Sequence, residues 1–194
     1  MKMKHPKLTL AAAFLFSQMA NAQLRMPLPT AFRADVQKVV ADFPSQFASL
    51  RGEVRITNPQ TVEYASLVQV DKAEDCIITK YSSNTKSVYS LYALMLRTEN
   101  FREAEKKYRW LYAQLKGMNV KYVVDKYTLE GAYEAPAEER KFTTSVLSVA
   151  DAPQALKKLR LEVSMQFEFP EWKVALTVFE KERDDDEAGA PNDY

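Results

Sequence analysis

The sequence predicts an α+β protein in which an antiparallel sheet carries two main helices packed on one face. Two stretches, 36–52 and 100–117, repeat apolar residues at helical spacing. Between and after them lie runs in which apolar and polar residues alternate, as in half-buried strands. Short polar turns separate these runs, and connections this short join antiparallel hairpins and not parallel crossovers.

The stretch 100–117 has the stronger helix signal. Asn100 is the predicted N-cap, Glu103 is placed to complete a capping box and to pair with Lys107, and Gly117 ends the helix. The apolar residues fall on one stripe: Phe101, Ala104, Tyr108, Leu111, Tyr112 and Leu115.

The other predicted helix starts after the N-cap Thr30. Pro44 removes a backbone hydrogen bond, but the apolar stripe keeps its phase across it, which favours a kink over a break. Gly52 is expected to form the left-handed C-terminal cap.

The two helical stretches align at a constant offset of 65 residues and end alike, in FASLRG and YAQLKG. About four predicted strands follow each. One interpretation is a duplicated helix-plus-four-strand unit with halves 30–97 and 98–180. The other is that two unrelated amphipathic helices happen to align. Strands are expected at 53–57, 61–70, 76–82, 87–97, 119–128, 141–149, 161–169 and 172–178, with a short helical turn at 151–159.

The first 22 residues have the pattern of a secretory signal peptide. Three lysines precede an apolar run at 8–16, and Ala20-Asn21-Ala22 forms a small-x-small cleavage site. We therefore expect a periplasmic or secreted single domain over 23–180, without a transmembrane segment in the mature chain. The remainder, 181–194, is charged and poor in large apolar residues, which predicts a disordered acidic tail.

Composition excludes several functions. The predicted signal contains three of the 27 basic residues and none of the 26 acidic ones, so the rest is close to neutral and gives no case for nucleic-acid binding. It also contains His5, the only histidine, so no imidazole remains for catalysis or metal binding. We expect no catalytic, cofactor or metal site.

Cys76 is the only cysteine, which rules out an intramolecular disulfide. It is expected to be a small buried residue; the alternative is a disulfide to another chain in an oxidising compartment.

Two motifs resemble functional sites. Ser83-Asn84-Thr85-Lys86 matches S-x-x-K, but on a turn its lysine would be hydrated and protonated. Asp184-Asp185-Asp186-Glu187 lacks the alternating ligands and the glycine of a calcium loop. We interpret the first as a hairpin turn and the second as part of the solvated tail.

Pleat alternation predicts a partner-binding face on the side of the sheet away from the helices. Its occupant is an unknown protein or ligand, a second copy of the chain in a homodimer, or a covering segment such as 24–28. If it were a dimer contact, Leu91→Glu would give a folded monomer. The residues expected on this face are Leu67, Tyr81, Tyr89, Leu91 and Met95.

The function predicted is therefore that of an exported, non-catalytic binding module that acts through its sheet. The alternatives are a hydrolase-type enzyme that uses carboxylate, serine or lysine groups without histidine, and a structural component of the cell envelope.

Overall fold

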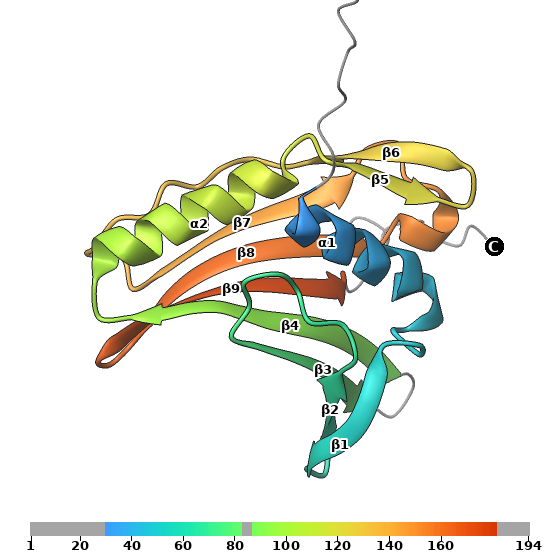
Figure 1. Cartoon of the computed structure of the whole chain (residues 1–194), viewed down its shortest axis with the longest axis horizontal. Helices are drawn as coiled ribbons and strands as arrows, with labels where there is room; N and C mark the ends of the chain where they lie inside the picture. The colour runs from blue at the N-terminus through green and yellow to red at the C-terminus, as the bar shows by residue number, and fades with distance from the viewer. Residues whose placement is uncertain (1–29, 83–86, 182–194) are drawn as a thin grey trace, which may run out of the picture.

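The computed structural model describes residues 30–82 and 87–181 and confirms a mixed α+β fold with one large antiparallel sheet (Figure 1). The predicted signal peptide, the Ser83-Asn84-Thr85-Lys86 turn and most of the predicted tail lie outside the described residues. The elements are, in order, α1 (Ala31–Asp42), the 3-10 turn η1 (Phe43–Ser45), β1 (Arg51–Thr57), β2 (Thr61–Ser66), β3 (Asp75–Ser82), β4 (Ser87–Thr98), α2 (Phe101–Leu115), β5 (Asn119–Tyr122), β6 (Asp125–Glu130), β7 (Phe142–Val149), the 3-10 turn η2 (Gln154–Leu156), β8 (Leu159–Glu168) and β9 (Glu171–Glu180).

The nine described strands follow the order β1-β2-β3-β4-β9-β8-β7-β6-β5. Two meanders thus run inward from opposite edges, and their last strands, β4 and β9, pair at the centre along most of their length. No parallel pair occurs among the described strands, as the short predicted connections required.

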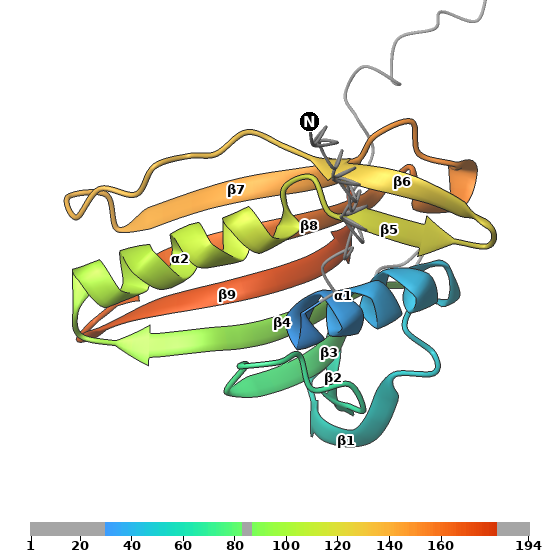
Figure 2. The ribbon, with the colours of Figure 1, turned by 45° about the horizontal axis from the view of Figure 1, so that its top comes forward.

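Helix α2 forms where the sequence predicts it. The Asn100 side chain accepts hydrogen bonds from the backbone amides of Arg102 and Glu103, at 2.9 and 3.3 Å. Its apolar stripe, apart from the half-buried Phe101, is buried against β4, β9 and β8, along which the helix runs (Figure 2). Tyr108 shares a 2.7 Å hydrogen bond with Ser145 of β7, and burial raises its pKa to about 12.

Helix α1 begins at the expected cap, since the Thr30 hydroxyl accepts from the Arg33 amide, but it ends earlier than expected. The α-helix stops at Asp42, and Pro44 lies in the 3-10 turn that follows. The expected kink was therefore wrong, because the missing proline amide breaks the helix here. Gly52 is likewise no cap and lies inside β1.

The stretch 119–128, expected as one strand, is a hairpin of β5 and β6. The turn consists of Val123 and Val124, with Val123 in the left-handed region at φ 56°. The outer edge of β5 is closed by α1: the Gln37 side-chain amide donates to the Lys121 carbonyl at 2.8 Å and accepts from the Lys121 amide at 2.7 Å.

The core lies on one face of the sheet, as the strand register shows. Residues directly paired across antiparallel strands point to the same face. One such row crosses five strands, β3, β4, β9, β8 and β7, and each of its members is fully buried. The row consists of Ile78, Leu91, Val178, Leu161 and Leu147. The buried side chains of α1 and α2 belong to the same core cluster.

Candidate functional site

The opposite face of the same five strands is not uniformly apolar. Its three central rows, which we call the open face, mix apolar, hydroxyl and charged side chains. The middle row is half-buried, apart from Val146, which is exposed. The rows are Thr79, Ser90, Phe179, Arg160 and Ser148; Ile77, Tyr92, Thr177, Glu162 and Val146; and Asp75, Leu94, Ala175, Ser164 and Thr144.

The face that the sequence predicted for Leu91 and Met95 was wrong. Both are buried in the core, and their neighbour Tyr92 lies on the open face. Nearly every position in 87–97 is apolar, so no alternation of polar and apolar residues indicates which side chains face the core. A register irregularity between Leu94 and Leu96 also shifts the phase within β4, so that Met95 and Leu96 both contact the core.

The other three predicted residues do not gather on one surface. Leu67 follows β2 and is 68% exposed, whereas Tyr81, 46% exposed, lies at the end of β3 with the parity of the open face. Tyr89 packs against the core. Its ring lies 4.7 Å from the Arg51 guanidinium, which also donates a 3.1 Å hydrogen bond to the Tyr89 hydroxyl.

The open face has a hollow at the end where β3, β4 and β9 meet. Its volume is about 520 Å³, and its apolar walls include Tyr81, Val88 and Phe179. Ser90 and Thr177 add hydroxyl groups to the lining. The hollow thus extends the open face toward an apolar recess beside Tyr81.

Two ionisable groups at the centre of the open face, both half-exposed, are partly shielded from water. Burial raises the pKa of Glu162, against a smaller opposing effect of the Thr144 hydroxyl. Burial also raises the pKa of Tyr92, against the charge of Lys173. Ionising either group at the centre of the open face is therefore less favourable than ionising it in water.

We expect Glu162→Gln to leave stability unchanged or to raise it by up to about 1 kcal/mol at neutral pH. A carboxyl whose folded pKa is raised destabilises the fold when ionised, and this cost is lost as the pH falls below both the folded and the unfolded pKa. Urea unfolding of both proteins at pH 7 and below about pH 4 measures the effect. An advantage of the variant that grows toward acid pH would contradict it.

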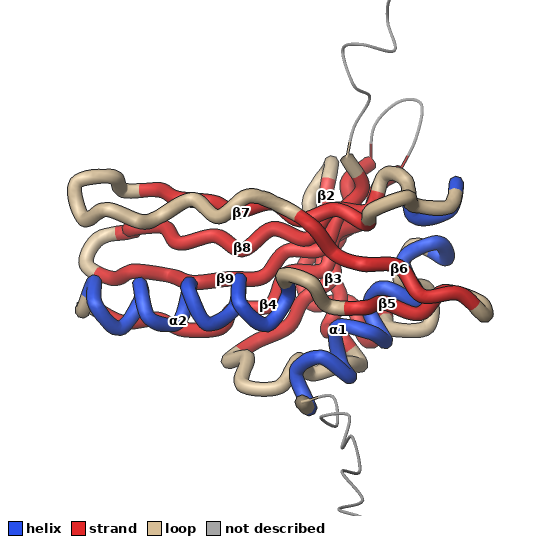
Figure 3. The backbone as a smooth tube through the Cα atoms, turned by 90° about the horizontal axis from the view of Figure 1, so that it is seen from above, coloured by secondary structure: helices blue, strands red, loops and turns tan. Residues whose placement is uncertain are grey.

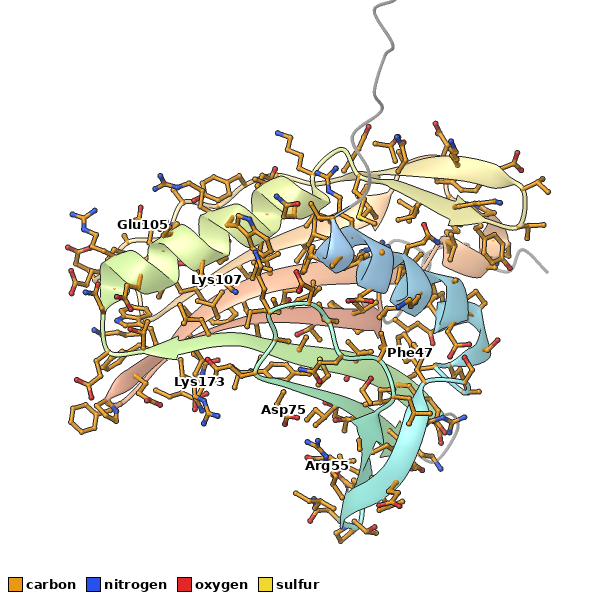
Figure 4. The ribbon with its side chains drawn as sticks, viewed as in Figure 1. Phe47, Arg55, Asp75, Glu105, Lys107 and Lys173 are labelled. Atoms are coloured by element: carbon orange, nitrogen blue, oxygen red, sulfur yellow. The ribbon has the colours of Figure 1, made fainter. Side chains whose placement is uncertain are left out.

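Two ion pairs lie at the margins of the open face. Arg55 of β1 reaches across β2 to bind both carboxylate oxygens of Asp75, at 2.9 and 2.8 Å (Figure 4). Lys173 pairs with Glu168 near the hairpin of β8 and β9. These charges are largely solvated, so they define the rim more than they stabilise the fold.

Cys76 lies on the core face, 2% exposed, and burial raises the pKa of its thiol. A disulfide to another chain would require this part of β3 to open. In the described part of the chain no three His, Cys, Asp or Glu side chains form a group that could hold a metal ion. None of the described helices combines the length and hydropathy needed to cross a membrane.

Sequence reasoning missed Tyr92, Thr177 and Glu162 as members of one surface. A usable signal existed for the last two, because Glu162 and Ser164 alternate with buried residues in β8, and Thr177 alternates in β9. Tyr92 could be added only by knowing that β4 pairs with β9. Comparison with known proteins gives no further lead: no family model, no curated protein and no solved structure matches this chain.

Proposed function

We propose that this protein is an exported binding module that uses the open face to bind a partner protein. One observation carries the proposal. Adjacent rows across five strands switch from fully buried, at Leu91 and its partners, to half-exposed, at Tyr92 and its partners.

The arrangement of the helices supports this proposal. Both α1 and α2 contribute buried side chains to the core cluster, and Figure 3 marks the two helices in blue beside the strands in red. We infer that the two helices form one layer and leave the open face to a partner. Five strands spaced about 4.8 Å apart make a surface roughly 20 Å wide, which suits a protein better than a small molecule, because small molecules bind in deeper pockets.

We also infer that the fold arose by duplication of a helix-plus-meander unit. The order of the strands supports this, because each half is a helix followed by a meander whose last strand pairs at the centre. The β5–β6 hairpin would then be an elaboration of the second half, at the place that the single bulged strand β1 occupies in the first. Export rests on the signal-peptide pattern, which predicts a periplasmic or secreted protein.

Site-specific crosslinking in the producing cell tests the binding face. A photoreactive phenylalanine analogue is placed at Tyr92 or Thr177, and at Arg102 as a control on the exposed surface of α2. We expect one protein adduct from the two open-face positions and none from position 102, and we expect Glu162→Arg to abolish it. Equal adducts at all three positions, or none on the open face, would contradict the proposal. An adduct of twice the chain mass would assign the face to a second copy.

A further inference from the structure

A separate crevice lies on the core side of the sheet, between α2 and the loop that connects β2 to β3. It has a volume of about 390 Å³, near the lower end of the range for small-ligand pockets. Its lining comes from α2, from Leu96 of β4 and from Lys72 of the loop. Figure 4 labels Lys107, which lies on the part of α2 that borders the crevice.

The loop that forms one wall is held in place at three points. The Asp71 amide donates to the Asp35 carboxylate of α1 at 3.1 Å, and the Glu74 amide donates to the Leu94 carbonyl of β4 at 2.7 Å. The Gln69 side chain closes the loop on itself by donating to the Ala73 carbonyl at 2.8 Å. Lys72 lies at the turn between them, in the left-handed region at φ 65°. The position of Lys72 is therefore set by the fold.

Two ammonium groups converge on one aromatic ring in this crevice. Lys72 Nζ lies 5.0 Å and Lys107 Nζ 5.2 Å from the centroid of Trp110, both within the range of a cation–π contact. Trp110 is itself fixed by an edge-to-face contact with Phe32 of α1, with centroids 5.2 Å apart. The two like charges thus share one fixed ring as a contact, and the charge of Lys72 acts on Lys107.

The crevice contains more positive than negative charge. Its lining has three lysines, at 72, 106 and 107, and one acid, Glu103. The pair expected between Glu103 and Lys107 is absent, because Glu103 instead accepts a 2.8 Å hydrogen bond from the Thr98 hydroxyl. Among the ion pairs between described residues, none includes any of the three lysines.

The electrostatics of Lys107 agree with this geometry. Burial lowers its pKa, and the charge of Lys72 lowers it further, against weaker opposing effects of Asp71 and Glu74. An anion placed between the two ammonium groups would remove this repulsion. The charge of the lining therefore favours an anionic occupant over a neutral one.

We propose that the crevice is a binding site for a small organic anion, with its acidic group between Lys72 and Lys107 and its apolar part against Leu96 and Trp110. A carboxylate or sulfonate attached to a planar hydrocarbon has this chemistry. A bare inorganic anion fits the crevice less well, because it would leave the apolar surfaces of Leu96 and the indole edge without contact. This site is independent of the open face and of the partner proposed for it.

Titration with naphthalene-2-sulfonate, followed by the indole N–H signals in NMR spectra of the full-length protein, tests the proposal. The chain has two tryptophans, and Trp110→Phe identifies the signal of Trp110. We expect that signal to shift saturably, while Trp172, buried under Phe101, does not. The uncharged analogue naphthalene-2-methanol and inorganic phosphate should each bind at least about tenfold more weakly.

Removing the charges of Lys72 and Lys107 tests whether they bind the anion. The double variant Lys72→Gln and Lys107→Gln should lose at least about tenfold in affinity for the sulfonate. Lys116→Gln should not, although Lys116 also lies near an aromatic ring of α2, 5.7 Å from the Tyr112 centroid. An unchanged Trp172 indole signal confirms that the variants stay folded. Equal affinity for the sulfonate and the methanol, or equal loss in the Lys116 variant, would overturn the proposal, as would no saturable shift.

Discussion

Leu91→Glu is expected to abolish folding or to reduce the free energy of unfolding by at least about 4 kcal/mol. Leu91 is fully buried between Ile78 of β3 and Val178 of β9, on the face that the core occupies. A carboxylate there has no described basic partner within the core cluster, all of whose members are apolar or aromatic. Either the charge is desolvated or the two central strands separate, and both are costly.

The neighbouring variant Tyr92→Glu is the matched control. Tyr92 lies on the open face, where a glutamate keeps contact with water, so we expect a loss below about 1.5 kcal/mol. Circular dichroism and urea unfolding distinguish the two. A folded Leu91→Glu monomer, as a dimer contact would require, would mean that the pleat of β4 has the opposite phase.

Gly131→Ala has the second large expected effect, a loss of about 3 kcal/mol or more. A Cβ at this position would lie 2.2 Å from the Val146 carbonyl oxygen and 2.9 Å from Leu147 Cα. Both are backbone atoms of β7, so no side-chain rotation relieves the clash. The Gly131 carbonyl also accepts a 2.8 Å hydrogen bond from the Tyr112 hydroxyl, which hinders the segment from moving away.

Gly117→Ala is the control for this prediction. A Cβ there meets no atom within 4 Å, but the backbone has φ +69°, so the cost is conformational and about 1 kcal/mol. Thermal and urea unfolding of both variants compare the cost of the steric clash at position 131 with the cost of the backbone strain at position 117. If Gly117→Ala proved the more damaging, the close approach of Gly131 to β7 would be contradicted.

The parts of the fold that could be predicted are those set by interactions between residues that are close together in the sequence. Asn100 and Thr30 cap the two helices because their side chains reach backbone amides two or three residues away. The hairpin of β8 and β9 was predictable because apolar and polar residues alternate throughout β8 and, apart from Ala175 and Phe179, along β9. These signals depend on neighbours in sequence, and the mixed α+β class follows from them.

The remaining features depend on contacts between distant segments. Val123 and Val124 form a tight turn, 74% and 79% exposed, although β-branched residues are unfavourable in the left-handed conformation that Val123 adopts. No sequence pattern marks such a turn. The face of β4 was misassigned for a similar reason, because only its register with β9 decides which of Leu91 and Tyr92 is buried.

The contact between Gln37 and the Lys121 backbone limits how copies of this protein can associate through their strands. The side-chain amide takes the place that an added strand would occupy at β5. At the other end of the sheet, no described strand pairs with the outer edge of β1. Of the two strands that end the described sheet, β1 is thus the one whose outer edge is open to strand addition. Two copies that met through β1 would each cover the open β1 edge of the other, which favours a closed pair over a fibre that grows through β1 and β5.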